Sequence, residues 1–220
     1  KELEKTGNKV FTYVFKAGEE NKNLNTVEDV YEFLIQNHFD RKDMLVALGG
    51  GVVGDLGGFA AACYMRGIRF VNMPTTSLSQ IDSSIGGKTA INLDGVKNSI
   101  GAFYQPELVV ADPDVLSTLP RRHLNNGLVE AVKAGLIGDA ALFSLFEETD
   151  VYSRIDEIIY RSLCVKKRVV EQDEKETGLR KTLNFGHTIG HGVESVYGLS
   201  GLLHGESVAV GMLPLIGNSA

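Results

Sequence analysis

Hydrophobic and polar positions divide the chain into two parts with different periodicities. In the first part, short apolar runs rich in β-branched and aromatic residues are bounded by glycine, proline and polar residues, as is typical of strands. The first expected helix between them runs from Thr26 as its N-cap to about His38. Strands that alternate with helices predict a parallel α/β sheet. The four expected strands lie at residues 10–15, 44–48, 69–73 and 108–111, and the strand at 44–48 is expected to be buried.

From about Leu119 onward, apolar positions recur at helical spacing. A change from strand-like to helical periodicity indicates a domain boundary, which we place between Pro113 and Arg122. We therefore expect a partial α/β domain over residues 1–118 and a partial all-α domain over 119–220. The expected helices span residues 123–138, 139–149, 151–172, 184–197 and 205–217.

Composition narrows the function classes. The 220 residues are 43% hydrophobic and 23% charged, an ordinary globular balance, and the net charge of −6 disfavours binding to nucleic acid or an anionic membrane. We find neither a membrane-spanning run nor an apolar secretory signal. Cys63 and Cys164 are expected to be buried free thiols of a reducing compartment. The first residue is not methionine and the last run is apolar, so we expect a fragment of a longer chain.

A glycine-rich segment follows the expected strand at 44–48 and precedes an alanine-rich helix that runs to about Met65. Its Gly49-x-Gly51-x-x-Gly54 spacing allows the backbone to approach a pyrophosphate at a helix N-terminus. The alternative is a tight strand–helix turn without a ligand. The acidic residue of the ordinary dinucleotide pattern is missing, because Pro74 and Thr75 stand in its place.

A polar stretch over residues 74–98 has little hydrophobic content and many hydrogen-bonding groups. The Gly-Lys-Thr sequence at 87–89 is similar to the end of a P-loop, but Asp82 occupies the place of the first glycine, which excludes a Walker A loop. Solvated surface charges are the alternative reading of its lysines. We favour a loop that holds an anionic substrate. The groups that would hold it are Lys88, Lys97 and Asn98.

Three of the five histidines fall within residues 187–204, and neutral imidazole is a common ligand for zinc-type metals. Helical spacing nominates His187, His191 and Glu194 as ligands on one helix. The rival set is Glu130, His187 and His204, which come from three segments. Local spacing does not choose between these sets, and each histidine or glutamate also has a structural alternative, a satisfied core group or a salt-bridged helix residue.

Arg180 and Asn184 extend the same pattern, since they precede His187 and His191 at intervals of four, three and four residues. These four residues share one face if the helix is continuous; alternatively, Asn184 is the N-cap and Arg180 lies just before the helix. In both cases a cation, an amide and two imidazoles converge. Burying so many polar groups is costly without a ligand.

Taken together, these segments resemble the 3-dehydroquinate synthase family of sugar-phosphate cyclases. The resemblance covers nearly the whole chain. It depends on motifs at residues 50–55, 74–76, 82–89, 97–98, 184–191 and 203–206.

The resemblance implies an N-terminal NAD-binding α/β domain, a C-terminal all-α domain and an active site in the cleft between them. It also implies a divalent metal, zinc or cobalt, bound by Glu130, His187 and His204. The implied active-site residues are Arg66, Asp82, Lys88, Lys97, Asn98, Lys133, Lys166, Arg180, Asn184 and His191. The implied NAD-binding residues are Glu19, Lys22, Gly50, Gly51, Val52, Val53, Gly54, Asp55, Thr75, Thr76, Asp82, Lys88, Lys97 and Thr118.

The implied activity converts 3-deoxy-D-arabino-heptulosonate 7-phosphate to 3-dehydroquinate and phosphate, with transient oxidation by NAD, in the shikimate pathway of the cytoplasm. Arg66 is implied to reach the site of a neighbouring subunit, so a homodimer is expected. The alternatives are another cyclase such as 2-deoxy-scyllo-inosose synthase, a metal-dependent alcohol or glycerol dehydrogenase, or an inactive truncated relative. The family's first βαβ portion and the last part of its helical domain are absent from this sequence.

Overall fold

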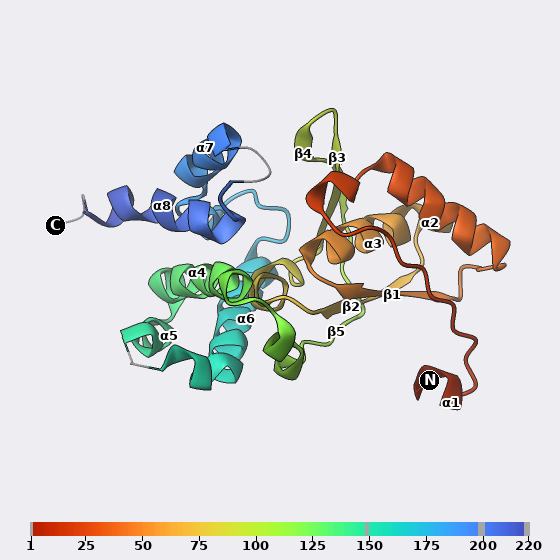
Figure 1. Cartoon of the computed structure of the whole chain (residues 1–220), viewed down its shortest axis with the longest axis horizontal. Helices are drawn as coiled ribbons and strands as arrows, with labels where there is room; N and C mark the ends of the chain where they lie inside the picture. Colours follow the sequence, from red (N-terminus) through yellow and green to blue (C-terminus); the bar gives the residue numbers. More distant parts are fainter. Residues whose placement is uncertain (1, 148–149, 198–200, 218–220) are drawn as a thin grey trace.

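The computed structural model describes residues 2–147, 150–197 and 201–217. The first part contains α1 (Glu2–Lys5), η1 (Glu19–Asn21), α2 (Leu24–Gln36), β1 (Met44–Gly49), α3 (Gly51–Cys63), η2 (Tyr64–Arg66), β2 (Arg69–Pro74), η3 (Ser79–Ser83), β3 (Lys88–Leu93), β4 (Val96–Phe103), β5 (Leu108–Val109) and η4 (Pro113–Thr118). The second part contains α4 (Arg121–Gly138), α5 (Ala140–Ser144), η5 (Leu145–Glu147), η6 (Val151–Arg154), α6 (Ile155–Gln172), η7 (Leu179–Asn184), α7 (His187–Tyr197) and α8 (His204–Gly217). The α/β elements and the later helices lie side by side, with the β3–β4 hairpin standing above the junction (Figure 1).

The main sheet has three parallel strands in the order β1-β2-β5. Met44 pairs with Arg69, and Val71 pairs with Leu108. The expected strands at 44–48, 69–73 and 108–111 are therefore confirmed, although β5 contains only two residues. This sheet, followed by helices, confirms the predicted fold class.

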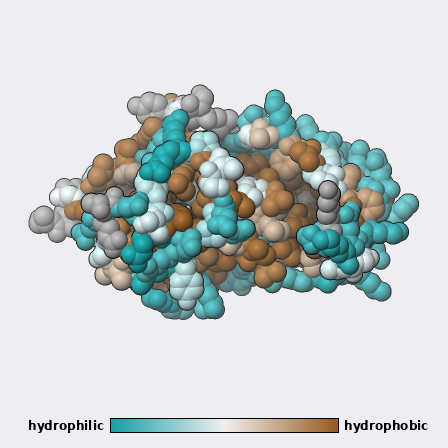
Figure 2. Space-filling view, turned by 60° about the horizontal axis from the view of Figure 1, so that its bottom comes forward, coloured by the Kyte–Doolittle hydropathy of each residue, from teal (hydrophilic) through white to brown (hydrophobic). Residues whose placement is uncertain are grey.

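The two faces of this sheet differ. Figure 1 shows α2 and α3 on one side of β1 and β2, and Ala47 on that side is only 2% exposed. Leu48, the next residue along β1, is 64% exposed, and Leu108 of β5 is 56% exposed. The expectation that residues 44–48 form a fully buried strand is wrong, because the described helices cover one face only. Figure 2 shows apolar side chains gathered on one face of the molecule.

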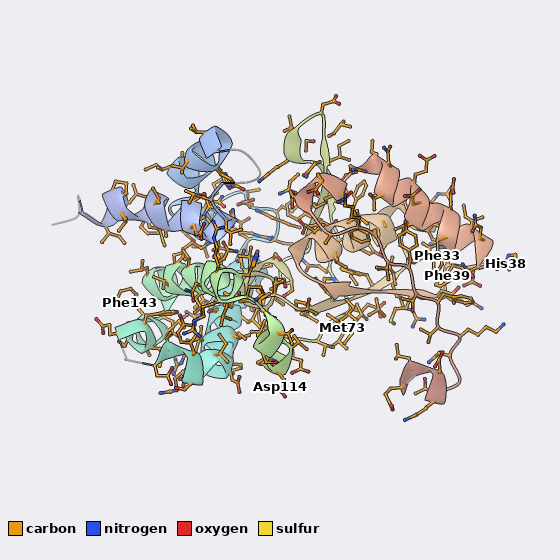
Figure 3. The ribbon with its side chains drawn as sticks, in the orientation of Figure 1. Phe33, His38, Phe39, Met73, Asp114 and Phe143 are labelled. Atoms are coloured by element: carbon orange, nitrogen blue, oxygen red, sulfur yellow. The ribbon has the colours of Figure 1, made fainter. Side chains whose placement is uncertain are left out.

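The strand expected at residues 10–15 is also wrong. Residues 8–17 are all described, and none of them belongs to a strand. The rings of Phe11 and Tyr13 instead pack against Phe39 and Phe33, at centroid distances of 5.7 and 5.3 Å. Figure 3 shows Phe33 and Phe39 close together around the end of α2. Aromatic side chains are common in strands because they pack well against neighbouring side chains. Here the two rings pack against aromatic residues at the end of α2, and no strand pairing is involved.

The helices of the α/β part begin earlier than expected. The side chain of Asn23, rather than Thr26, caps α2, since its Oδ1 accepts a hydrogen bond from the Thr26 N–H at 3.1 Å. The helix α3 begins at Gly51, so most of the glycine-rich segment is its first turns. It ends at Cys63 rather than Met65, which has a positive φ of 48°.

The hairpin of β3 and β4 was not anticipated, since residues 74–98 were expected to be a loop. The strands pair antiparallel, with Lys88 opposite Phe103 and Ile91 opposite Ile100. Asp94 and Gly95 connect them with φ values of 50° and 77°. Two consecutive positive φ values are typical of a tight hairpin turn, so the Asp-Gly pair was a usable signal for the hairpin.

The helices of the second part enclose a separate core. Leu128 and Ala131 of α4, Leu142 of α5, and Ile158 and Val165 of α6 are each less than 7% exposed. The helices expected at 123–138, 151–172, 184–197 and 205–217 are confirmed with shifted ends. The helix expected at 139–149 is shorter, since α5 ends at Ser144 and the 3-10 turn η5 follows it, and residues 148 and 149 lie outside the described part.

Both cysteines are free thiols, but their expected burial is wrong. Cys63 at the end of α3 is exposed, and Cys164 on α6 is half-buried. Over the described residues, each helix is too short or too polar to cross a lipid bilayer.

Candidate metal centre and adjoining cavity

One carboxylate and two imidazoles from three different helices meet at one point. Glu130 comes from α4, His187 from the start of α7 and His204 from the start of α8. The Nε2 atoms of His187 and His204 lie 3.7 and 3.5 Å from Glu130 Oε1. Potential ligand atoms of all three residues lie within 4.8 Å of one another. The structure thus brings together the rival ligand set, which sequence spacing left open.

Glycines allow these helices to approach closely. A Cβ on Gly205 would lie 2.0 Å from the backbone oxygen of Asn126, so only glycine fits where α8 starts against α4. The Gly205 N–H also donates to Asn126 Oδ1 at 2.6 Å. Gly186, with a positive φ of 79°, turns the chain immediately before His187. These contacts place His204 and His187 at neighbouring helix starts.

Glu130 is almost fully buried, with 1% of its surface exposed. The Lys133 ammonium forms an ion pair with Oε2, yet among the described residues neither carboxylate oxygen accepts a hydrogen bond. Burial would raise the pKa of Glu130, but Lys133 and His204 bring it below its ordinary value, so the carboxylate is charged. Buried polar atoms are normally hydrogen-bonded, and Lys133 pairs with Oε2 alone, so a cation between Oε1 and the two imidazoles would complete the contacts of this carboxylate.

The imidazole of His187 has the orientation and the protonation state that metal binding requires. Its Nδ1 lies 3.3 Å from the carbonyl oxygen of Phe185, and since a carbonyl can only accept, Nδ1 is the protonated nitrogen. The unprotonated Nε2 therefore faces Glu130. Burial, and then the nearby Lys133, lower the pKa of His187 to about 4. The ring is neutral at neutral pH, the form that coordinates a metal.

His204 has the opposite electrostatics. Burial would lower its pKa, but the carboxylates of Glu130 and Glu194 raise the pKa of His204 to about 9. A metal that binds at Nε2 therefore displaces a proton. The donor set fits such an ion, because tetrahedral zinc with bonds of roughly 2.0–2.2 Å separates its ligand atoms by roughly 3.3–3.6 Å. The observed separations of 3.5 and 3.7 Å lie close to that range.

A second group of possible ligands shares one histidine with the first. His191, Glu194 and His204 also place one ligand atom each within 4.8 Å of one another. His191 is exposed in this group. Among the described residues, the one-helix set of His187, His191 and Glu194 does not form such a group.

A cavity of about 550 Å³ adjoins the cluster and collects many of the predicted site residues. Its wall combines side chains of α3, η3, the β3–β4 hairpin, α4, α6, η7, α7 and α8. The predicted residues that line it are Asp55, Asp82, Lys88, Asn98, Lys133, Lys166, Arg180, Asn184, His187, His191 and His204.

Two buried lysine side chains line this cavity. Lys133 and Lys166 are 3% and 8% exposed, and Lys166 Nζ lies 2.8 Å from Asp82 Oδ1. Although burial opposes it, Lys166 and Lys133 hold the pKa of Asp82 well below its ordinary value. Burial lowers the pKa of Lys166 despite the attraction of Asp82. Lys166 pairs with Asp82 and Lys133 pairs with Glu130, so an anionic ligand in the cavity would share these two ammonium groups with the carboxylates.

Arg180 and Asn184 enter the cavity from η7 rather than from α7, so the four-residue stripe does not belong to one helix. Gly186 interrupts it. Arg180 is 1% exposed and donates to the Gly86 carbonyl at 2.9 Å. Asn184 Nδ2 donates to Glu176 Oε1 at 2.8 Å.

Glu176 is a cavity residue that our sequence analysis missed. Its carboxylate lines the cavity and forms an ion pair with Lys88 in addition to its contact with Asn184. It lies in the charged run at residues 171–176, where local sequence does not distinguish it from its solvated neighbours. Its left-handed backbone, with a φ of 59°, is likewise visible only in the structure.

A second buried charge cluster unites three segments of the α/β part. Lys22 is 3% exposed, and its Nζ lies 2.9 Å from Glu19 Oε1, 3.0 Å from Asp55 Oδ2 and 2.7 Å from Asn98 Oδ1. Burial would lower the pKa of Lys22, but Asp55 and Glu19 raise it. This ion cluster fixes η1 and the hairpin against the first turns of α3.

Several predicted residues lie outside the cavity wall. Gly50 precedes α3, and the following residues through Asp55 form its first turns; the Thr75 N–H donates to the Gly49 carbonyl at 2.8 Å beside them. Lys97 forms an ion pair with Glu194. Arg66 is exposed with a φ of 68°, and Thr118 is exposed on η4. The remaining members outside the wall are Glu19, Lys22, Gly51, Val52, Val53, Gly54, Thr76 and Glu130.

Known proteins match both parts of the chain. The family model for the 3-dehydroquinate synthase N-terminal part matches residues 12–126, and the model for the C-terminal part matches residues 127–219. The chain belongs to the 3-dehydroquinate synthase family. A 3-dehydroquinate synthase of Streptococcus thermophilus is 51% identical over 218 residues, which cover 97% of this chain and 61% of that protein. The chain thus spans about 60% of the length of the curated relatives it matches.

Two solved cyclase structures are similar over the same region. The 2-epi-5-epi-valiolone synthase from Streptomyces hygroscopicus, with NAD⁺ and Zn²⁺ bound, has a TM-score of 0.83 and 34% identity. A 2-deoxy-scyllo-inosose synthase, complexed with carbaglucose-6-phosphate, NAD⁺ and Co²⁺, has a TM-score of 0.84 and 36% identity. Each match covers 90% of this chain and 57% of the solved chain.

Proposed function

We propose that this chain belongs to a 3-dehydroquinate synthase that converts 3-deoxy-D-arabino-heptulosonate 7-phosphate to 3-dehydroquinate and phosphate. The observation that carries the proposal is the buried Glu130 carboxylate, whose Oε1 accepts no hydrogen bond from the described residues and faces His187 and His204 beside a cation-lined cavity. Greater identity to curated 3-dehydroquinate synthases than to the two cyclases favours this activity over theirs.

Glu130, His187 and His204 would hold a divalent zinc or cobalt ion, and residues 50–55 at the start of α3 would hold the NAD pyrophosphate. Backbone N–H groups at a helix N-terminus suit phosphate oxygens, and the glycines there leave room for close approach. When bound, NAD⁺ supplies reversible hydride acceptance and the metal supplies Lewis acidity.

The cavity residues would bind and orient the substrate. Lys88, Lys133, Lys166 and Arg180 offer positive charge to its phosphate and carboxylate, and Asn184 and His191 add hydrogen-bonding groups. Arg180 is positioned by its bond to the Gly86 carbonyl, so its guanidinium keeps a fixed direction. Glu176, between Lys88 and Asn184, orients these two side chains at the cavity wall.

We extend the proposal to the assembly and location of the protein. Residues 1–118 would form part of the NAD-binding domain and residues 119–220 part of the metal- and substrate-binding domain. A homodimer is supported by Arg66, which is exposed outside the cavity of its own chain and so is free to reach a partner. A cytoplasmic location is supported by the two free thiols, which suit a reducing compartment.

The test is a coupled assay on the full-length protein that carries this sequence. With 3-deoxy-D-arabino-heptulosonate 7-phosphate and NAD⁺, we expect phosphate release without net accumulation of NADH, and loss of that release after chelation. Steady NADH formation from a simple polyol would instead indicate a dehydrogenase. Turnover of a hexose 6-phosphate in place of the heptulosonate would indicate another cyclase. Absence of both NAD binding and bound metal would leave a non-catalytic relative.

A further inference from the structure

Glu194 on α7 stands between the candidate metal centre and the β3–β4 hairpin. Its side chain is 15% exposed. One carboxylate oxygen, Oε1, pairs with the Lys97 ammonium of β4, and the other, Oε2, lies 3.6 Å from His204 Nδ1. The carboxylate therefore contacts two cationic or protonatable groups from two different segments, one with each oxygen.

The two nitrogens of His204 face different carboxylates. Nε2 faces Glu130 within the candidate metal centre, and Nδ1 faces Glu194. His187 has the same division, because its Nε2 faces Glu130 while its Nδ1 faces the Phe185 carbonyl. Histidines that bind a metal usually donate their other N–H to such an acceptor, which fixes the ring orientation. Each imidazole in this cluster thus has an acceptor behind it.

We propose that Glu194 is a positioning residue: it holds the His204 ring in the metal-binding orientation through Nδ1 and couples that ring to Lys97 of the hairpin. The inference rests on the proposed metal site of Glu130, His187 and His204. It adds a residue that touches neither the metal nor the substrate. Displacing Lys97 would alter the acceptor strength that Glu194 offers to His204, so the hairpin and the metal centre are linked through one carboxylate.

The rival role for Glu194 is direct coordination together with His191 and His204. Two observations favour positioning. Oε1 of Glu194 is already paired with the Lys97 ammonium, whereas Oε1 of Glu130 faces only the two imidazoles. In addition, His204 would have to bind the ion through the nitrogen that faces Glu194, which would leave the buried charge of Glu130 without a cation beyond Lys133.

Glu194→Gln tests the proposal, because the glutamine amide has one acceptor oxygen for two donors. Lys97 and His204 then compete for it, and we expect the affinity for Zn²⁺ to fall by roughly 10- to 100-fold. Adding Lys97→Met removes one competitor, so the double variant should recover part of the lost affinity. Glu171→Gln is the matched control, since Glu171 is an exposed helix glutamate that pairs with Lys167 at 3.7 Å, and it should bind Zn²⁺ as the wild type does.

The measurement is competition with a chromophoric chelator on the full-length protein, accompanied by the visible spectrum of bound Co²⁺ and by circular dichroism to confirm folding. Unchanged Zn²⁺ affinity in Glu194→Gln would overturn the proposal. A double variant that binds no better than Glu194→Gln would also overturn it, because the two donors would then not share the carboxylate. Failure of the wild type itself to bind Zn²⁺ or Co²⁺ would instead refute the proposed metal site.

Discussion

Two clusters of buried charge in this molecule differ in how fully the chain supplies partners for the central charged group. In the Lys22 cluster, the buried ammonium has three acceptors, on Glu19, Asp55 and Asn98, at 2.7–3.0 Å. In the Glu130 cluster, formed by Glu130, Lys133, His187 and His204, the buried carboxylate pairs with Lys133 through Oε2 but accepts no hydrogen bond from the part of the chain that the structure describes. The first cluster is complete within the chain, whereas the second has room for a cation between its carboxylate and two imidazoles. The number of satisfied contacts therefore distinguishes a structural ion cluster from a candidate binding site.

The largest effect should come from removing one candidate metal ligand of the Glu130 cluster. We expect His204→Ala to lower metal affinity by more than the roughly 100-fold that is typical of losing an orienting group, because a direct ligand is lost. His191→Ala should keep the metal and lower substrate turnover, since His191 lines the cavity outside the cluster. Metal content after dialysis and phosphate release check the two halves. Metal loss in the His191 variant with retention in the His204 variant would assign the ion to the second group.

Removing the cation of the Lys22 cluster should act on stability instead. Lys22→Met leaves Asp55 and Glu19 without their shared partner, and breaking a buried ion pair costs about 3–5 kcal/mol in unfolding free energy. Urea unfolding without NAD measures this loss, and metal affinity should not change. The control is Lys167→Met, whose ion pair with Glu171 is exposed and contributes about 0–1 kcal/mol. Equal stability of the two variants would show that the Lys22 cluster does not stabilise the fold.

The smallest effect should come from a half-buried surface carboxylate, Asp173, whose partners are backbone N–H groups. Asp173 accepts hydrogen bonds from the Arg180, Gly178 and Thr177 N–H groups, which lower the pKa of Asp173 from 3.8 to about 2. A carboxyl whose pKa is lowered in the folded state stabilises it above pH 3.8 and loses this effect as pH falls through about 2.

We therefore expect Asp173→Asn to lower the Tm near neutral pH and to approach the wild-type Tm as the solution is acidified through that window. Thermal unfolding followed by circular dichroism over a pH series measures the difference. A Tm difference that stays constant across the acidic range would contradict the assignment, because the substitution would then act through something other than the charge of Asp173.

Local patterns in the sequence predicted the parallel strands and the later helices because those elements depend on nearby residues. The apolar run at 44–48 was sufficient to identify β1, but not the exposure of Leu48, which depends on what covers each face. Phe11 and Tyr13 have strand-like character, yet their rings are taken up by Phe39 and Phe33. Such outcomes are decided by neighbours that are distant in sequence.

The site shows the same limit. Spacing alone left two ligand sets open, because Glu130 lies 57 residues before His187 in the printed numbering and no periodicity connects them. Only the resemblance to a family chose Glu130, His187 and His204. Neither residue spacing nor the family resemblance identified Glu176, because its place in the cavity depends on the turn that brings it to Lys88 and Asn184. The family motifs were informative because they identify residues that meet in the folded protein, whereas local spacing identifies only residues that are close in sequence.

The most direct test of our account is to locate the metal in the full-length protein. Crystals grown with Zn²⁺ and measured at wavelengths on both sides of the zinc absorption edge give the position of the ion from its anomalous scattering. We predict one ion at roughly 2.0–2.2 Å from a Glu130 oxygen and from Nε2 of both His187 and His204. An ion bound by His191, Glu194 and His204, or an ion distant from Glu130, would contradict it.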